Sequence, residues 1–407
     1  MIKITDKHDC CGCSACVQRC PKQCISLKED EEGFLYPKVN IDECIDCHLC
    51  EKVCPWLNRP DKLQLLEVLA VKNRNEEERM ASSSGGVFIA IAKKVIERGG
   101  VVFGAVFDDN WEVVHKYSET IDGVKPMMGS KYVQSRIGNC YREAENFLKS
   151  GREVMFTGTP CQITGLHRFL RKEYSNLLSV DFLCHGVPSP GVWRKYLTEA
   201  FDIHTQKCVV RKKTDKSEPL TTAPVITDID FRNKRLKGWR DFSFVVYGNL
   251  SVSDKKQVLL ADSHNENPFM RGFLNDVYLR PSCYNCKCKN GISHSDLTIA
   301  DYWAIDLFMP NFNDDKGVSL VIVNTQRGKE LFDCLNMDKK CSSLSDAKPM
   351  NGGFKEYISE NPKRKMFFEC LSNGDSVEVA VEKFLYVPAY KVMLTRLKNK
   401  IIKAIKF

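Results

Sequence analysis

Two copies of one cysteine spacing, C-x2-C-x2-C-x3-C-P, lie close to the start of this 407-residue chain. Their cysteines are Cys10, Cys13, Cys16 and Cys20 in the first copy and Cys44, Cys47, Cys50 and Cys54 in the second. Three closely spaced thiolates can bind one face of an iron–sulfur cubane, while the fourth cysteine, directed away by the following proline, reaches the neighbouring cluster. The repeat therefore predicts a small module that holds two 4Fe-4S clusters.

The ligands of these two clusters are expected to be shared crosswise between the copies. One cluster takes Cys10, Cys13, Cys16 and Cys54, and the other takes Cys44, Cys47, Cys50 and Cys20. Cys11 and Cys24 are surplus, and residues 33–39 have the pattern of a short strand and turn. We therefore expect residues 1–58 to form a small α+β domain like bacterial ferredoxins. Two zinc knuckles are the alternative, but zinc sites favour four ligands in each run with a loop between pairs.

The chain has 20 cysteines, and its length argues for metal ligation or thiol chemistry rather than for disulfides. Disulfide frameworks belong to small secreted chains. This sequence has no apolar run of about 18 to 20 residues and no apolar region typical of a signal peptide at its start, so we expect a soluble cytoplasmic protein. A net charge of +8 weakly favours acidic partners. The sequence contains neither a helix-turn-helix nor a zinc-finger pattern, so nothing in it predicts nucleic-acid binding.

After the cysteine repeats, the sequence predicts a polar linker at residues 59–79 and then an α/β domain. Apolar runs typical of strands alternate there with helical patterns. The expected strands are 101–107, 111–117, 153–157 and 177–183, and the expected helices are 85–98 and 162–172. We divide this domain into residues 80–200 and 201–370, followed by a helical basic tail at residues 371–407.

Two loops of this domain carry groups that suit a bound cofactor. Residues 82–86, Ser-Ser-Ser-Gly-Gly, precede a helix, so their hydroxyl and N–H groups form a cradle for a phosphate. A serine-rich helix cap is the ordinary alternative. Residues 131–135 combine a cation, an aromatic ring and an amide, which suit a flavin, although a surface loop can contain the same residues.

Four further cysteines, in three segments of the chain, predict a third metal site. Cys161 and Cys184 each follow an expected strand, so both thiols lie at the carboxyl edge of the sheet if those strands are parallel neighbours. Cys283 and Cys286 add a C-x2-C pair, with Cys288 as a competing ligand. Together these thiols suffice for a third cluster. The alternative is that they are buried cysteines without function, which are common in protein interiors.

Five short motifs carry a family resemblance. They are SGG at residues 84–86, GTPCQ at 158–162, CHGVPS at 184–189, CYNC at 283–286 and SDLTIADYW at 295–303. Over about residues 69 to 368, the chain resembles the family of the beta subunits of coenzyme F-420 hydrogenase and dehydrogenase. That family binds FAD and a 4Fe-4S cluster and passes electrons between clusters and a deazaflavin or another reducible compound.

The resemblance implies a cofactor site and a cluster site at defined positions. FAD contacts are expected at Ser84, Gly85, Gly86, Lys131 and Tyr132, with Asp301 as a further cofactor contact, and the third cluster at Cys161, Cys184, Cys283 and Cys286. In this chain Ala300-Asp301 stands where many relatives have Gly-Asp. The expected fold is therefore an α/β (α+β) domain that binds flavin and an iron–sulfur cluster, preceded by the ferredoxin-like domain.

These features predict an iron–sulfur flavoprotein oxidoreductase. Clusters carry one electron each, and a flavin connects them to substrates that take two. His185, beside Cys184, is a candidate proton donor, although a structural imidazole is the alternative. The partners are expected to be an electron donor or acceptor protein or reduced coenzyme, and a small-molecule or lipid-linked substrate. The alternative function is an electron-transfer adaptor for a partner reductase or hydrogenase, without a substrate of its own.

The fused ferredoxin and the CHGVPS motif resemble bacterial members associated with surface polysaccharide synthesis, where a glycan precursor is the expected substrate. The end of the chain suits such a substrate. Residues 391–407 contain six Lys and Arg, no acidic residue and apolar residues at helical spacing. Such a helix can lie peripherally on the inner face of an anionic membrane, or pack on its own domain with a solvated basic face.

Overall fold

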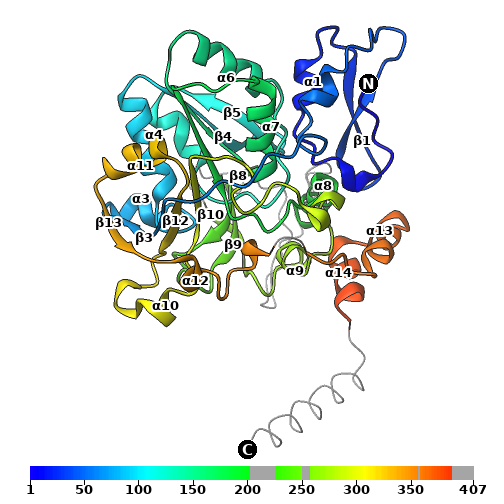
Figure 1. The fold of residues 1–407 in the computed structure, drawn as a ribbon. Helices are drawn as coiled ribbons and strands as arrows, with labels where there is room; N and C mark the ends of the chain where they lie inside the picture. The colour runs from blue at the N-terminus through cyan, green and yellow to red at the C-terminus, as the bar shows by residue number, and fades with distance from the viewer. Residues whose placement is uncertain (202–224, 250–256, 356–357, 387–407) are drawn as a thin grey trace, which may run out of the picture.

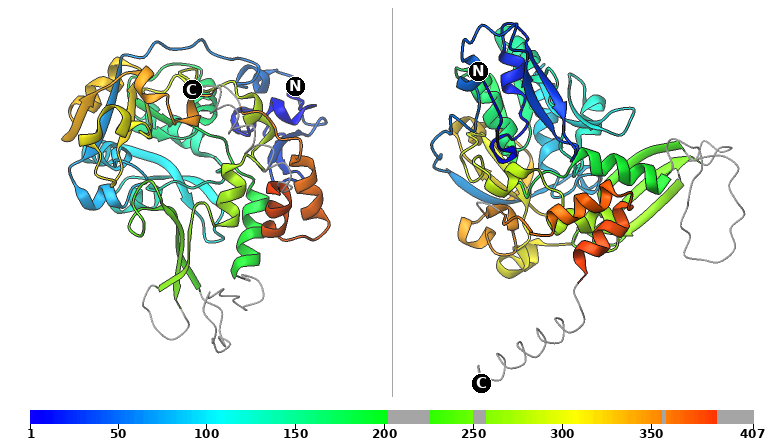
Figure 2. Two further views of the ribbon diagram at one scale, coloured as in Figure 1. Left: turned by 90° about the horizontal axis from the view of Figure 1, so that it is seen from below. Right: turned by 90° about the vertical axis from the view of Figure 1, so that its right-hand side faces the viewer.

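The computed structural model describes residues 1–201, 225–249, 257–355 and 358–386. These residues form a small cysteine-rich module, a large mixed α/β domain, and a three-stranded sheet that projects from it (Figures 1 and 2). The tail at residues 391–407 lies outside the described residues, so the predicted basic helix stays a prediction. No helix in the described part of the chain is long and apolar enough to cross a membrane.

The cysteine-rich module repeats one local conformation in both cysteine copies. Its elements are η1 (Lys7–Asp9), α1 (Ala15–Arg19), β1 (Ile25–Glu29), β2 (Leu35–Val39) and α2 (Leu49–Lys52). Gly12 and Ser14 in the first copy have φ values of 72° and 64°, and the matching residues Asp46 and His48 have 47° and 57°. Both copies therefore make the same left-handed turns before a short helix, as the repeat predicts. The antiparallel β1–β2 hairpin confirms the expected strand near residues 33–39.

The large domain is built on one mixed sheet with strand order β13-β3-β12-β11-β7-β6-β4-β5. Its strands are β3 (Glu67–Asn73), β4 (Val101–Phe107), β5 (Val113–Ser118), β6 (Val154–Thr157), β7 (Leu177–Phe182), β11 (Leu297–Asp301), β12 (Ser319–Val323) and β13 (Met337–Cys341). Strands β4, β6, β7 and β11 are parallel. Their carboxyl ends therefore meet at one edge of the sheet, where α/β proteins form their ligand sites.

Alternating side chains of the strands bury both faces of this sheet under helices. On β4, Phe103 packs with residues of α6 (Cys140–Lys149) and α7 (Pro160–Leu170), whereas Val102 faces α4 (Val87–Glu97) and α11 (Gln326–Asp333). Both β4 side chains are fully buried. This pattern is typical of strands covered on both sides. The remaining helices of the domain are α3 (Glu76–Met80), α5 (Ile121–Val124), α10 (Ile305–Phe308) and α12 (Leu344–Ala347), with 3-10 turns η2 (Lys125–Met127), η3 (Pro281–Asn285), η4 (Pro310–Phe312) and η5 (Gly352–Phe354).

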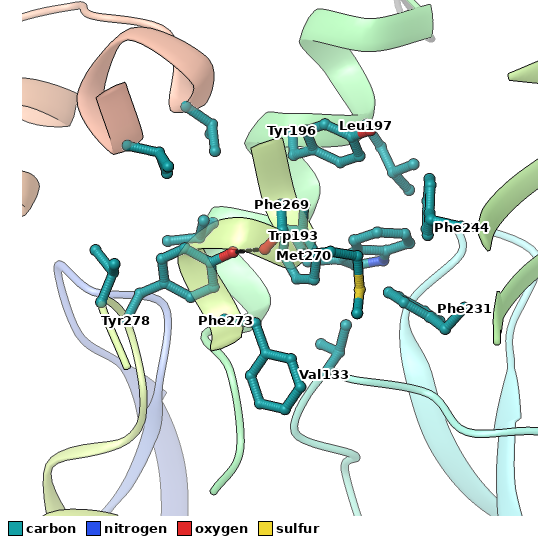
Figure 3. Close-up of a cluster of buried hydrophobic side chains, with 14 of the residues drawn as sticks. Val133, Trp193, Tyr196, Leu197, Phe231, Phe244, Phe269, Met270, Phe273 and Tyr278 are labelled. Carbon is teal, nitrogen blue, oxygen red and sulfur yellow. Dashed lines mark hydrogen bonds between the residues drawn. The ribbon is translucent and has the colours of Figure 1, made fainter. Parts of the chain in front are cut away.

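The second sheet, of order β10-β9-β8, is anchored by an aromatic core. Its strands are β8 (Val225–Asn233), β9 (Ser243–Asn249) and β10 (Gln257–Ser263), and the neighbouring helices are α8 (Pro190–Phe201), α9 (Pro268–Leu274), α13 (Arg364–Ser372) and α14 (Val377–Leu385). Figure 3 shows Trp193 of α8 between Phe231 of β8 and Phe269 of α9, with ring centroids 5.1 and 5.0 Å away. This core holds the base of the sheet beside the large domain.

The structure confirms most expected elements and corrects two assignments. Strand 101–107 is β4, strands 153–157 and 177–183 are β6 and β7, and the two expected helices are α4 and α7. The prediction of a linker at residues 59–79 was wrong, because these residues contain β3, which pairs with β12 and β13 inside the sheet. Because charged residues lie on both sides of this buried strand, the sequence pattern of the region is that of a polar segment. The predicted boundary between residues 80–200 and 201–370 was also wrong, because β11, β12 and β13 belong to the same sheet as β4 to β7.

The small module is fixed to the large domain by tight packing and charge pairs. Gly33 and Gly191 approach so closely that a Cβ on Gly33 would lie 2.3 Å from the Gly191 nitrogen. Arg364 of α13 donates to both carboxylate oxygens of Glu32, and both side chains are largely buried. Figure 1 shows α1 of the module beside α7 of the large domain.

Candidate cofactor cleft and iron–sulfur sites

A cleft of about 590 Å³ lies at the carboxyl edge of the large sheet. Loops that follow β6 and β7, the ends of β11 and the start of β12 line it, together with the base of the three-stranded sheet. Most of its wall is apolar, with a small number of polar and charged groups. A volume between roughly 300 and 1,000 Å³ with this lining is typical of small-molecule and cofactor sites.

The structure brings nearly all of the predicted cofactor contacts into this one cleft. Its lining includes Ser84, Gly86, Lys131, Tyr132, His185 and Asp301. Gly85 is the exception, because it lies behind the wall and its N–H donates to Ser319 Oγ at 2.9 Å. A Cβ on Gly85 would lie 2.4 Å from the Val71 carbonyl oxygen, so glycine is needed there for close packing.

The serine-rich loop is held in place by hydrogen bonds from three segments. Ser83 Oγ accepts from the Ser130 N–H at 2.7 Å, and Ser84 Oγ donates to the Val318 carbonyl at 3.0 Å. Buried Lys234 donates through Nζ to the Ser84 carbonyl at 2.8 Å and to the carbonyls of Arg79 and Lys316 at 2.7 Å each. The loop therefore presents Gly86, with φ of 80°, at the N-terminus of α4 as part of the cleft wall.

Lys131 directly follows Ser130, which is bonded to the serine-rich loop, and donates to the Met128 carbonyl at 3.0 Å. Burial lowers the pKa of Lys131 to about 8, which makes its charge sensitive to pH near neutrality. Asp301 ends β11, and its carboxylate is already engaged by Arg232 and by the Trp239 indole N–H, the latter at 2.8 Å. Asp301 therefore orients Arg232 in the cleft in addition to lining it.

Two histidines line the cleft near the ends of β5 and β7. His185 Nε2 lies 2.6 Å from Asp276 Oδ1, and its ring stands edge-on to Phe273. His115 was not among the predicted residues. Its Nε2 lies 2.9 Å from the Thr157 carbonyl oxygen, and burial lowers its pKa to about 4, so it is neutral at physiological pH. A single histidine on a strand carries no sequence signal for this position.

The predicted third-cluster cysteines converge immediately beside the cleft. Cys161 lies in the first turn of α7, and its Sγ is 3.1 Å from Oγ1 of Thr159, which lines the cleft. The hydrogen bond with Cys11, burial and nearby Cys286 raise the pKa of Cys161 well above its usual range. Burial raises the pKa of Cys184 likewise, with further contributions from Cys283 and Cys161. Neighbouring buried thiols resist ionisation together, and bound iron would supply the positive charge that they need as thiolates.

Cys286 and Cys288 both lie in this group of thiols. Cys286 lies close enough to raise the pKa of Cys161, Cys184 and Cys283. Cys288 is fully buried, and burial together with nearby Cys161 and Cys286 raises its pKa well above the usual range. Both cysteines are therefore candidates for the fourth ligand.

The eight ferredoxin-type cysteines gather in two groups that follow the crosswise pairing. Cys54, from the second copy, lies near Cys16 and Cys13 of the first. Cys20, from the first copy, lines one cavity with Cys44, Cys47 and Cys50. Cys24 lines the same cavity, with its Sγ 3.5 Å from that of Cys20. In the described part of the chain no three His, Cys, Asp or Glu side chains are grouped as ligands of a single metal ion.

Cys11 and Arg280 connect the module to the third group of thiols, and neither was predicted to do so. The Cys11 thiol lies beside Cys13 of the module and Cys161 of α7, close enough for both to shift its pKa. Gly165 permits this approach, because a Cβ there would lie 2.8 Å from Cys13 Cβ. Arg280, only 1% exposed, donates to the carbonyls of Cys10 and Leu35 at 2.7 and 2.9 Å, three residues before Cys283. A buried arginine has no pattern in the sequence that reveals its partners.

Comparisons with known proteins identify two regions of the chain. Residues 151–347 match the family model that describes the carboxyl-terminal part of the beta subunits of coenzyme F420 hydrogenase/dehydrogenase. Residues 9–58 match the model of the 4Fe-4S dicluster domain. The second match covers both cysteine copies, and the first contains the four proposed ligands of the third cluster and His185.

Individual proteins are similar to parts of this chain. The F component of the F(420)H(2) dehydrogenase of Methanosarcina mazei is 26% identical over 190 residues, which cover 44% of this chain and 54% of that protein. The match thus spans about half the length of that relative. Ferredoxin-1 of Caulobacter vibrioides is 42% identical over 52 residues, which cover 13% of this chain and 42% of that protein. A chain of the F420-reducing NiFe hydrogenase complex from Methanosarcina barkeri is 15% identical, with a TM-score of 0.44 over 79% of this chain and 92% of that chain.

Four of the five motifs that first indicated the family lie where the family model matches, whereas SGG at residues 84–86 precedes it; the repeated cysteine spacing lies where the dicluster model matches. Residues 9–58 of this chain thus match the 4Fe-4S dicluster domain, and residues 151–347 match the carboxyl-terminal part of the beta subunits of coenzyme F420 hydrogenase/dehydrogenase.

Proposed function

We propose that this protein is an iron–sulfur flavoprotein oxidoreductase. In this proposal electrons pass between a redox partner, the two clusters of the module, a third cluster on Cys161, Cys184, Cys283 and Cys286, and a flavin in the cleft. The observation that carries the proposal is the continuity of these sites. Cys11 joins the module to Cys161, and Cys161 lies 3.1 Å from a residue that lines the cleft.

The residues of the cleft fit a flavin. The N-terminus of α4, preceded by Gly86, presents N–H groups that have no partner within the helix and suit a phosphate, and Lys131 adds a cation. Apolar side chains such as Met127, Val187 and Phe273 form the wall that a planar ring requires. A bound flavin would connect one-electron clusters to a two-electron substrate, taking up two electrons, one at a time, and a proton.

His185 is placed to serve this chemistry. It directly follows the proposed ligand Cys184, lines the cleft and is paired with Asp276. The Asp276 carboxylate fixes the orientation of the ring at the cleft wall. We propose that it supplies a proton to the reduced substrate. A glycan precursor as that substrate, a role in surface polysaccharide synthesis and membrane contact through the tail stay predictions.

Iron, sulfide and flavin content of anaerobically purified protein tests the proposal. We expect about twelve irons per chain and one flavin. The double substitution Cys161→Ser, Cys184→Ser is expected to lower the iron content to about eight, because only the third cluster loses its ligands. About eight irons and no flavin in both proteins would contradict the proposal and favour an electron-transfer adaptor.

A further inference from the structure

Arg232 on β8 is a buried cation with unused hydrogen-bond donors. It is only 4% exposed, and its guanidinium lies over the rings of Phe242 and Trp303, 4.4 and 5.0 Å from their centroids. Nη1 donates to the Asp301 carboxylate, whereas Nε and Nη2 have no hydrogen-bond partner among the described residues. Buried polar groups are nearly always paired with protein, water or ligand, so these two donors require a partner.

Arg240 lines the same cleft as Arg232 and also has a guanidinium donor without a hydrogen-bond partner among the described residues. Its Nη2 donates to the Trp303 carbonyl at 3.1 Å and to the Asp306 carboxylate. Its Nε has no partner within the part of the chain that the structure describes. Both arginines line the cleft. Two separate segments, β8 and the connection to β9, therefore bring unsatisfied guanidinium donors to one wall.

The charges around this wall favour an anion. The cleft is lined by three cations, Lys131, Arg232 and Arg240, and by two carboxylates, Asp181 and Asp301. Burial raises the pKa of Asp181 to about 6, which further reduces the negative charge that lines the cleft. Tyr132 faces Arg232 and brings one more polar group to the wall.

We propose that Arg232 and Arg240 form a subsite that binds a phosphate or carboxylate oxyanion of a ligand in the cleft. The planar guanidinium forks match two oxygens of such a group, which is the geometry in which arginine binds anions most strongly. Asp301 and the stacked rings hold Arg232 in position for this contact. The inference deepens the proposed function, because the anion belongs either to the diphosphate of the cofactor or to an acidic group on the second substrate.

Pyrophosphate binding to the full-length protein tests the subsite, measured by calorimetry under anaerobic conditions. The substitution Arg240→Gln is expected to weaken the binding at least tenfold, because it removes charged donors that the protein does not otherwise use. Arg235→Gln is the matched control: Arg235 is exposed, lies in the same connection and does not line the cleft, so we expect the wild-type affinity. Equal affinity in both variants, or no binding by flavin-free wild-type protein, would overturn the inference.

Arg232 needs a paired substitution, because its loss alone would leave the buried carboxylate of Asp301 without its cation. The double variant Arg232→Gln, Asp301→Asn removes both charges and is also expected to lose at least tenfold in pyrophosphate affinity. Circular dichroism and iron content report whether it folds. If it does not fold, Arg240→Gln decides the question.

Flavin binding distinguishes the two sources of the anion. If the arginines bind the cofactor, Arg240→Gln weakens FAD binding while riboflavin, which lacks phosphate, binds as before. If they bind the second substrate, FAD affinity is unchanged and pyrophosphate still binds to FAD-loaded protein. Failure of the proposed function has a different signature, since a chain that binds pyrophosphate but no flavin would retain the subsite and refute the flavoprotein assignment.

Discussion

The contact made by Arg280 between the module and the large domain can be tested quantitatively. The side chain donates to the Cys10 and Leu35 carbonyls and, at 2.8 Å, to Gln134 Oε1, and its guanidinium lies 4.4 Å from the ring centroid of Tyr36. Replacing it with glutamine leaves buried acceptors without donors, at about 1–3 kcal/mol each. Because glutamine can replace one bond, we expect the docked arrangement to lose about 3–4 kcal/mol.

Hydrogen exchange measures this loss directly. A change of about 3–4 kcal/mol raises the population of the open arrangement by roughly two to three orders of magnitude. Amides of η1 and β2, which carry or adjoin the Arg280 acceptors, should lose protection by this factor in Arg280→Gln. Arg280→Lys should be intermediate, because an ammonium keeps the charge but not the planar fork. Protection within threefold of the wild-type value in Arg280→Gln would refute the reasoning.

A matched control comes from Arg271, whose pair with Glu382 lies at the surface with side chains 28% and 56% exposed. Exposed ion pairs contribute little, so Arg271→Gln should leave the exchange of η1 and β2 unchanged. Loss of protection in this control would show that the effect of Arg280→Gln is not specific to docking.

Three further outcomes follow from the same structure. Burial lowers the pKa of Lys131 from 10.5 to about 8, so between these pH values the unfolded chain binds more protons than the folded protein. The free energy of unfolding of the wild type should therefore rise relative to that of Lys131→Met as the pH increases from 8 toward 10. Anaerobic denaturation measures this difference. Lys234→Met should release the serine-rich loop and weaken flavin binding at least tenfold, whereas Lys316→Met, at an exposed ion pair, should not. Cys286→Ser should lower iron content by about four atoms per chain and Cys288→Ser should not; the reverse result would assign Cys288 as the ligand.

Several elements could be predicted because their determinants are local. The apolar runs of β4, β6 and β7 are bounded by turn residues, and each was located within two residues. β3 was missed because charged segments flank its apolar residues, and only its pairing with β12 and β13, over 240 residues away, makes it a strand. The serine-rich loop of the cofactor cleft was found because it precedes a helix, whereas Gly85 differs from its neighbours through packing on Ser319.

The sequence by itself determined the cluster-binding module, because ligand order and the following proline act over a few residues, and both copies fold alike. It also predicted that Cys161 and Cys184 each follow a strand, and the structure shows that these strands, β6 and β7, are parallel neighbours. Only the tertiary structure decided that Cys11 meets Cys161, that Arg280 crosses to the module and that Arg232 and Arg240 face the cleft with unused donors. These features depend on contacts between segments far apart in the chain, and the spacing of residues along the sequence does not predict such contacts.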